Sequence, residues 1–338
     1  MNSIPTTMKA AVARRYGKPT VVNIEQVPTP SPGPGEILVR VRATTLNRTD
    51  CGYRAGTPFI IRFWGGLRRP KNPIWGTEFA GDVAALGEGA SQFAVGDRIA
   101  GWCDGTFGAH AEYLVIKETR VIVPIPPGRS YAEAAPSVEG ALYSLGMLRK
   151  AKIGPGKDVL VYGATGAIGS AAVQLAKDLG ARVTAVGPTA HLDMVKGLGP
   201  DRVVDYQRER WTRDSQRYDL ILDAVGKSGF FRTRRLLKKK GLYTASDVRG
   251  SHVPFLAVPV ILVWVVSAML FKLWPGRKMI FVVPHKDPEG IRYLKEFIAS
   301  GRYRPVLDEH RYRLDQIVEA YRFVETGKKV GSVVVEVG

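Results

Sequence analysis

The fold is decided by residues 158–177, which read DVLVYGATGAIGSAAVQLAK. An apolar strand is followed directly by a turn of small residues and then by an apolar helix. Small residues let the backbone approach a pyrophosphate, and the free N–H groups and the dipole of the following helix stabilise its charge. Ala164 replaces the first glycine of the G-x-G-x-x-G pattern, whereas Gly166 and Gly169 keep the other two. The stretch therefore predicts a site for a nicotinamide dinucleotide.

The secondary-structure pattern before this stretch differs from the pattern around it. Before it, strand-like segments with period-two alternation are separated by turns rich in Pro and Gly, which is typical of a β-rich domain. Around it, helices alternate with short apolar strands, and this pattern predicts an α/β, doubly wound parallel sheet. We expect the β-rich domain over 1–128, the dinucleotide-binding domain over 129–287, and a return to the first domain over 288–338.

Composition is typical of a globular protein. The chain has 338 residues, of which 45% are hydrophobic and 24% charged, and this balance excludes a disordered chain. Two cysteines, Cys51 and Cys103, are too few for a disulfide framework and indicate a reducing compartment. The N-terminal segment carries basic residues without an apolar run behind them, so we expect a cytoplasmic protein.

The formal net charge is +18, a balance that could attract nucleic acid, an anionic membrane or phosphorylated ligands. We expect the densest cationic cluster to coat the solvated face of a helix whose apolar residues face the core. The cations are Arg232, Arg234, Arg235, Lys238, Lys239 and Lys240, and the apolar residues are Phe230, Phe231, Leu236 and Leu237. No helix-turn-helix pattern, zinc finger or aromatic stacking platform accompanies the cluster, so we do not expect a nucleic-acid partner.

An apolar segment over 253–271 contains 19 residues without a charge and is long enough to span a bilayer. Two prolines interrupt it, and it lies between two segments, 242–245 and 279–283, that we assign to neighbouring strands of one sheet. One interpretation of the segment is peripheral contact with a membrane, helped by basic residues that follow it.

Several motifs that follow one another over nearly the whole chain resemble the medium-chain dehydrogenase/reductase superfamily, and specifically its zinc-free quinone oxidoreductase branch. They are PGEILVRV at 34–41, GTEFAG at 76–81, VGDRI at 95–99, AHAEY at 109–113, the turn at 163–169 and DAVG at 223–226. The resemblance implies a GroES-like, β-rich catalytic domain with a Rossmann domain inserted before its last segment. It also implies an NADP-dependent oxidoreductase that acts on small electron-poor molecules. For the apolar segment 253–271, the resemblance implies a helix at a homodimer interface or over the substrate cleft, and peripheral membrane contact is the alternative.

The resemblance is also informative where the chain departs from the zinc relatives. In the zinc alcohol dehydrogenases, a cysteine stands at the position of Asn47 and a histidine at that of Thr77, and both bind the catalytic ion. Neither Asn nor Thr is a usual zinc ligand, and the isolated Cys103 cannot supply a structural zinc lobe. We expect Cys51 to be a small buried residue. The sequence therefore predicts no metal.

A site without a Lewis acid is poorly equipped to oxidise simple alcohols. Hydride can still add to a quinone, or to the β-carbon of an α,β-unsaturated carbonyl compound, if a donor stabilises the developing oxyanion and a proton follows. The candidate catalytic residues are Asn47, Thr49 and Tyr53. In the relatives, the position of Thr49 holds the hydroxyl that bonds the substrate oxygen. The branch tends to place a tyrosine at the position of Gly52, so ordinary packing is the alternative role for Tyr53.

The second strand of the dinucleotide fold leads into GPTAH at 187–191, without an acidic residue. An acid there would bond the ribose 2′-hydroxyl and repel a 2′-phosphate, so NADPH is favoured over NADH. The relatives place phosphate contacts at the positions of Arg48, Thr189 and Tyr206, and His191 could add a basic group. The full set of expected cofactor contacts is Arg48, Gly163, Thr165, Gly166, Ala167, Ile168, Gly169, Thr189, His191, Tyr206, Ala224 and Val225.

The sequence thus predicts an NADPH-dependent, zinc-independent reductase of quinones or α,β-unsaturated carbonyl compounds. One alternative is another NADP-dependent alcohol or carbonyl oxidoreductase. The other is a non-catalytic binding protein that keeps the fold and associates with a membrane or with RNA.

Overall fold

We analysed a computed structural model of the chain, which describes residues 3–59, 61–103, 105–246, 276–280 and 287–338. Backbone contacts divide the chain into two compact units. The β-rich unit comprises Met1–Glu139 and Lys295–Gly338, and the parallel-sheet unit comprises Gly140–Leu294. The sequence predicts these boundaries at 128/129 and 287/288. The boundaries from backbone contacts lie further along the chain, within α4 (Glu139–Lys150) and α9 (Pro288–Ala299).

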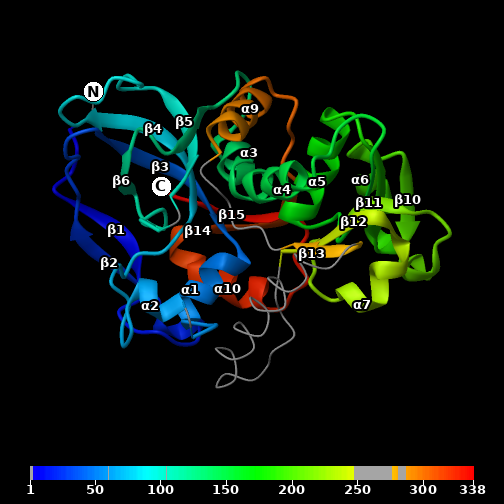
Figure 1. The fold of residues 1–338 in the computed structure, drawn as a ribbon. Coiled ribbons are helices and arrows are strands. Elements are labelled where there is room, and N and C mark those ends of the chain that lie inside the picture. The colour runs from blue at the N-terminus through cyan, green and yellow to red at the C-terminus, as the bar shows by residue number, and fades with distance from the viewer. Residues whose placement is uncertain (1–2, 60, 104, 247–275, 281–286) are drawn as a thin grey trace. The chain divides into compact units, whose positions relative to one another are not determined.

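The β-rich unit is built on a mainly antiparallel sheet in the order β14-β15-β3-β4-β5-β7, with β6 paired to β3. The last strand, β15, pairs antiparallel with β3, where Val333 lies opposite Leu46. The C-terminal segment therefore completes the sheet that the N-terminal third begins, as the sequence predicted (Figure 1). The strands of this unit are β1 (Thr7–Val12), β2 (Asn23–Pro28), β3 (Glu36–Leu46), β4 (Glu78–Leu86), β5 (Arg98–Trp102), β6 (Tyr113–Lys117), β7 (Val121–Pro124), β14 (Leu307–Arg313) and β15 (Ser332–Glu336).

Short helices cover the core of this unit. Helix α10 buries Ile317, Ala320, Tyr321 and Val324, a spacing of three and four residues that places them on one face. It lies beside α1 (Figure 1), and both helices contribute to a core that includes Trp75. The helical segments are η1 (Pro19–Val21), α1 (Arg48–Ala55), α2 (Ile61–Gly65), α3 (Tyr131–Ala134), η2 (Ala135–Ser137), η6 (Leu314–Gln316) and α10 (Ile317–Glu325).

The parallel-sheet unit contains six described strands in the order β10-β9-β8-β11-β12-β13, all paired in parallel. The chain moves outward from β8 to β10, returns to the other side at β11 and continues to β13. This reversal is the switch point of a doubly wound sheet, so the predicted fold class is confirmed. The strands are β8 (Asp158–Tyr162), β9 (Arg182–Gly187), β10 (Arg202–Asp205), β11 (Tyr218–Asp223), β12 (Leu237–Ala245) and β13 (Lys278–Ile280).

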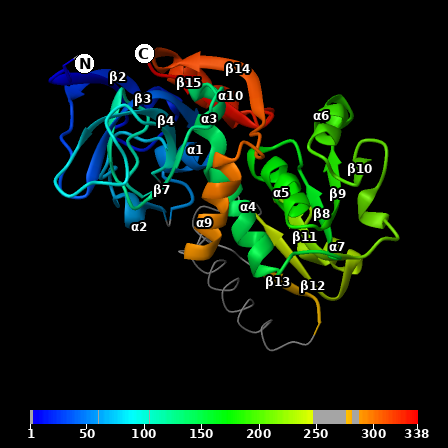
Figure 2. The ribbon, with the colours of Figure 1, turned by 90° about the horizontal axis from the view of Figure 1, so that it is seen from above.

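Helices connect these strands. Figure 2 shows α5 alongside β8 and α6 alongside β10, in agreement with their contacts. The small residues Gly169, Ala172 and Ala176 lie on the buried face of α5 and let the helix approach the sheet closely. The helical segments are α4 (Glu139–Lys150), α5 (Ala167–Asp178), η3 (Thr189–His191), α6 (Leu192–Gly197), η4 (Trp211–Arg213), α7 (Phe230–Thr233), η5 (Arg234–Leu236) and α9 (Pro288–Ala299).

The predicted cationic helix is wrong in its second half. Helix α7 is one turn long, and Lys238, Lys239 and Lys240 belong to β12, which pairs in parallel with β11. Lys238 Nζ lies 2.6 Å from carboxylate oxygens of both Asp158 and Asp219, so this lysine bridges neighbouring strands. The placement of Phe231 in the core is also wrong, because the residue is 73% exposed. Sheet pairing thus overrode the helical pattern.

The apolar segment 253–271 lies outside the described residues. In the parts of the chain that the structure describes, no helix combines the length and apolar character that crossing a membrane requires.

Candidate active site

The glycine-rich turn packs tightly between β8 and α5. Gly163 has a φ of +86°, and a Cβ there would lie 2.4 Å from Val225 Cγ2. A Cβ on Gly169 would lie 2.0 Å from the carbonyl oxygen of Gly163. Gly166 is the residue that precedes α5, and Ala167 and Ile168 form the start of the helix. The two glycines that the pattern retains, Gly166 and Gly169, therefore stand at the strand-to-helix junction that a pyrophosphate site needs.

The other predicted cofactor residues of this unit lie at the same edge of the sheet. The strand registers bring the carboxyl ends of β8, β9, β10 and β11 together, because Val186 and Asp223 both lie opposite Tyr162 and Gly187 opposite Asp205. The predicted contacts follow these ends directly: Thr165 after β8, Thr189 and His191 after β9, Tyr206 after β10, and Ala224 and Val225 after β11.

One acidic residue at this edge was missed by the sequence analysis. The Asp205 carboxylate accepts a hydrogen bond of 2.5 Å from Thr189 Oγ1 and one of 2.9 Å from the Gln207 N–H. The Thr189 hydroxyl is the main reason that the pKa of Asp205 is lowered, so the carboxylate is ionised at neutral pH. An acid that selects NADH is expected at the end of the second strand, whereas Asp205 ends the third strand, β10.

A second cluster forms inside the β-rich unit around Glu78, at the start of β4. Glu78 Oε1 accepts the backbone N–H groups of Val138 at 3.1 Å and Glu139 at 2.7 Å. Its Oε2 accepts hydrogen bonds from Thr45 Oγ1 at 3.0 Å and Asn47 Nδ2 at 3.1 Å. The side chain is buried, and burial together with the charge of Glu139 raises the pKa of Glu78 against the effect of these donors.

Glu139, the first residue of α4, is the partner of Glu78 in what we call the acidic pair. Glu139 Oε1 accepts a hydrogen bond of 2.6 Å from Thr49 Oγ1. Its Oε2 lies 3.1 Å from Thr77 Oγ1 and 3.4 Å from Asn47 Nδ2. The amide of Asn47 therefore joins the two carboxyl groups, and the Thr49 hydroxyl is attached to one of them.

The three predicted catalytic residues differ in their contacts: Asn47 and Thr49 bond the acidic pair, whereas Tyr53 packs against aromatic rings. Asn47 is 7% exposed, and its Nδ2 donates to the acidic pair and to Thr45. Thr49 is half-buried, with its hydroxyl on Glu139. The Tyr53 ring stacks on Trp75 at 5.7 Å and meets Phe107 edge-on at 4.6 Å, so this tyrosine is part of an aromatic cluster.

Two further predicted positions lie on α1. Arg48 begins the helix, and its guanidinium lies so close to Gly327 that a Cβ on that glycine would be 3.0 Å from Nη2. Cys51 is buried, as predicted, and burial raises the pKa of its thiol to about 12. A thiol held in this form is a poor nucleophile at neutral pH.

The acidic pair was not visible in the sequence. Glu78 belongs to the motif GTEFAG, in which the resemblance points to Thr77 alone. Glu139 has the sequence context of an ordinary acidic residue in the first turn of a helix. The two residues are 61 positions apart in the chain. Only the fold of the β-rich unit brings β4 against the start of α4.

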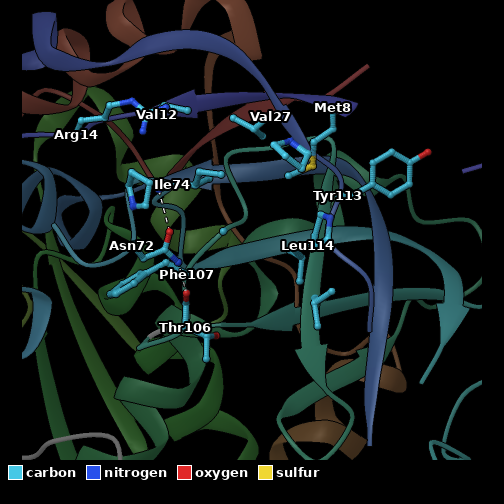
Figure 3. A pocket seen from close by; sticks show the side chains of 15 residues that line it. Met8, Val12, Arg14, Val27, Asn72, Ile74, Thr106, Phe107, Tyr113 and Leu114 are labelled. Carbon is cyan, nitrogen blue, oxygen red and sulfur yellow. Dashed lines mark hydrogen bonds between the residues drawn. The ribbon is translucent and has the colours of Figure 1, made fainter. Parts of the chain in front are cut away.

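The β-rich unit also carries a surface pocket of about 470 Å³, lined mainly by apolar residues of β1, β2 and β6 and two loops (Figure 3). Two of its polar side chains, those of Asn72 and Arg14, have protein partners. Asn72 bonds the backbone of Thr106 and Ile74, and Arg14 pairs with Glu25. None of the predicted site residues lines this pocket.

Comparison with protein-family models gives two matches. Residues 33–127 match the alcohol dehydrogenase GroES-like domain, and residues 198–335 match a model described as zinc-binding dehydrogenase. These two regions together cover most of the chain and follow the order that the resemblance predicted.

Curated relatives match over nearly the full length. A 2-methylene-furan-3-one reductase of Solanum lycopersicum is 28% identical over 98% of this chain and 80% of its own length. A chloroplastic quinone oxidoreductase of Triphysaria versicolor is 29% identical over 92% of both chains. Among solved structures, the quinone oxidoreductase from Coxiella burnetii shares the fold, with a TM-score of 0.81 and 24% identity over 98% of this chain and 100% of that one.

The GroES-like sheet closed by the C-terminal strand, the doubly wound sheet with its glycine-rich turn, and the full-length relatives agree with one another. The chain belongs to the medium-chain dehydrogenase/reductase superfamily and is an oxidoreductase related to quinone and alkenal/one reductases.

Proposed function

We propose that the protein is an NADPH-dependent, zinc-independent reductase that transfers hydride to quinones or α,β-unsaturated carbonyl compounds. The observation that carries this proposal is the Thr49 hydroxyl, held at 2.6 Å by a buried carboxyl group in the unit that matches the GroES-like catalytic domain. A half-buried hydroxyl of this kind can bond a substrate oxygen and pass a proton to it. The names of the relatives, which include an NADPH-dependent alkenal/one oxidoreductase of Arabidopsis thaliana, support the substrate class.

The donor set around Glu139 does not suit the zinc that the description of one matching family model implies. Structural and catalytic zinc sites use cysteine, histidine and carboxylate ligands. Here one carboxyl group is surrounded by the Asn47 amide and the Thr49 and Thr77 hydroxyls, which are not ligands of these kinds. In the described parts of the chain, no group of three or more His, Cys, Asp or Glu residues could hold a metal ion. The residues around Glu139 therefore do not fit a catalytic zinc ion.

The chain's own residues supply binding and proton chemistry in this proposal. Bound NADPH would supply the hydride. The turn around Gly166 and the first N–H groups of α5 would hold its pyrophosphate, because these groups have no carbonyl partner within the helix. Thr49 would donate to the substrate oxygen as negative charge develops there. Tyr53, packed against Trp75, would shape the site rather than act as an acid.

The choice of NADPH rests on the absence of an acid at the end of β9 and on the basic residues nearby. Arg208 lies 3.6 Å from Asp205, and Tyr206 is 44% exposed beside them. One observation favours NADH as the second candidate: the Asp205 carboxylate holds the Thr189 hydroxyl that would otherwise meet a 2′-phosphate. An ionised acid at this place repels a phosphate and suits a ribose hydroxyl. Titration of the protein with each cofactor separately decides between them.

The apolar segment 253–271 enters the proposal only by its composition. We propose that it contributes to a homodimer of a cytoplasmic enzyme, and peripheral contact with an anionic membrane is the alternative. Light scattering of the purified protein tests the dimer. Flotation with anionic vesicles tests the membrane contact.

The proposed activity is tested by NADPH consumption with a panel of quinones and α,β-unsaturated aldehydes and ketones. We expect turnover with at least one acceptor, and we expect Thr49→Val to lower kcat by about 10²-fold, the usual loss when a proton donor is removed. Thr49→Ser keeps the hydroxyl and is the matched control. A protein that binds NADPH but reduces no member of the panel would favour a non-catalytic binding role.

A further inference from the structure

The acidic pair is buried, and only its contact with Thr49 enters the proposed function. Glu78 is 1% exposed and Glu139 is 5% exposed, and Asn47 Nδ2 bridges them with contacts of 3.1 and 3.4 Å. Two ionised carboxylates this close repel each other in a medium of low dielectric constant, so such a pair retains a proton that a single exposed carboxyl group would lose. The pair is therefore a store for one proton at neutral pH.

The donors around the pair indicate which member carries that proton. Burial and the charge of Glu139 raise the pKa of Glu78, so the two carboxyl groups compete for one proton. The two backbone N–H groups at Glu78 Oε1 can only donate, so they disfavour a proton on that oxygen and shift the shared proton towards Glu139. The contacts of Glu139 through Thr49 and Thr77 are with hydroxyl groups, which can either donate or accept. Glu139 can therefore carry a proton and donate it to Thr49 Oγ1 without losing the 2.6 Å contact. In that state the Thr49 hydroxyl hydrogen points away from Glu139 and can be donated to a substrate oxygen.

Other charged groups face the pair from the surrounding segments. Lys329, in the turn before β15, is half-buried and interacts electrostatically with Glu139, Arg48 and Asp308. Tyr303, in the loop before β14, is buried and faces Glu78, whose charge helps to raise the pKa of this phenol. Asp50 of α1 accepts the Asn47 backbone N–H at 2.8 Å. The positive charge of Lys329 stabilises the second negative charge that the pair gains when its proton leaves.

From this geometry we infer that Glu139, with Glu78 behind it, is the proton source for the reduction and acts through the Thr49 hydroxyl. The inference rests on the proposed function, because it needs a substrate oxygen at Thr49. Glu139 is thus a positioning residue that reaches the substrate only through Thr49. This role gives the carboxyl group a task in the chemistry beyond holding α4 against β4.

The step balances in atoms and electrons. Hydride addition to the β-carbon of an enone moves the π-electron pair onto the carbonyl oxygen. The Thr49 O–H bond then breaks as the enol O–H bond forms, and the Glu139 Oε1–H bond breaks as the Thr49 O–H bond is restored. The enol becomes the saturated carbonyl compound, and the pair, now doubly ionised, takes up one proton from solvent. A quinone likewise needs one hydride and one proton to become a hydroquinone.

The test compares Glu139→Gln with Glu78→Gln in the full-length protein. Gln at 139 keeps the size and hydrogen bonds of the side chain but has no proton to release. We expect kcat to fall by about 10²-fold. We also expect the wild type to lose activity at high pH and this variant to lack that loss. Gln at 78 removes the neighbouring charge, so Glu139 should lose its proton more readily. We expect the alkaline limb of the kcat profile to move at least one pH unit lower.

Controls separate this role from a structural one. Glu319→Gln replaces an exposed glutamate of α10 in the same unit and should match the wild type. NADPH affinity and the melting temperature report whether each variant is folded. If Glu139→Gln does not fold, the shift in Glu78→Gln and a solvent deuterium isotope effect on wild-type single turnovers still test the inference. A wild type without turnover defeats the proposed function. An active wild type whose pH profile is unchanged in these variants overturns the proton source alone.

Discussion

Gly169→Ala tests the geometry of the cofactor turn most sharply. The added Cβ would lie 2.0 Å from the Gly163 carbonyl oxygen, 2.7 Å from the Gly163 carbonyl carbon and 3.0 Å from Ala164 Cα. All three are backbone atoms that cannot rotate away, so the turn or the helix must move by about 1 Å to restore ordinary contact distances. Overpacking of this kind costs about 1–3 kcal/mol. Because the displaced backbone is the part that would hold the pyrophosphate, the same cost falls on binding.

We therefore expect Gly169→Ala to raise the Kd for NADPH by about tenfold to a hundredfold, since each factor of ten corresponds to about 1.4 kcal/mol. Fluorescence titration measures the Kd, and urea unfolding measures the loss of stability. Gly197→Ala is the matched control, because a Cβ there meets nothing within 4 Å at the end of α6. That variant should bind NADPH like the wild type and gain about 0.4–1 kcal/mol in stability. Wild-type affinity in a folded Gly169→Ala protein would refute the role of the turn.

Two further predictions concern titratable groups. His110 is 1% exposed, and burial lowers its pKa from 6.5 to about 4, so the unfolded chain takes up a proton in this range that the folded chain does not. The contribution of His110 to the free energy of unfolding is full above about pH 6.5 and falls by about 3 kcal/mol towards pH 4. Urea unfolding at several pH values should show a weaker dependence of this free energy on pH in His110→Gln. An equal dependence in both proteins would contradict the prediction. Asp205→Asn should lower the Kd for NADPH about tenfold and leave the Kd for NADH unchanged. Asp193→Asn, on an exposed side chain, should change neither Kd. A higher Kd for NADH in Asp205→Asn would instead support NADH as the cofactor.

The sequence was sufficient for the fold because the fold depends on local patterns. The strand, turn and helix around Gly166 are contiguous, and the parallel strands follow from alternation with helices. The pattern failed at Lys238–Lys240, where charged residues continue a strand and Lys238 is held by carboxylates of two neighbouring strands. A helical pattern of charge cannot report pairing partners that lie far away in the chain.

The candidate site was less accessible to sequence reasoning. Thr49 could be chosen from its position in a motif, but its hydroxyl is oriented by Glu139, which lies on another element. Asp205 was missed for the same reason, because it meets Thr189 only through the register of β9 and β10. Contacts between side chains of distant segments depend on strand order and register, and neither can be read from one sequence. These contacts set the charge and the hydrogen bonding of the site.

Hydride transfer itself is the central claim, and isotope transfer tests it directly. The protein would be incubated with each of the two NADPH diastereomers deuterated at C4 of the nicotinamide and with an α,β-unsaturated ketone, and the product would be analysed by mass spectrometry. We predict one deuterium at the β-carbon of the saturated ketone from one diastereomer and none from the other. Saturated ketone that carries no deuterium from either diastereomer, or no reduction of any enone or quinone by cofactor-bound protein, would contradict the account.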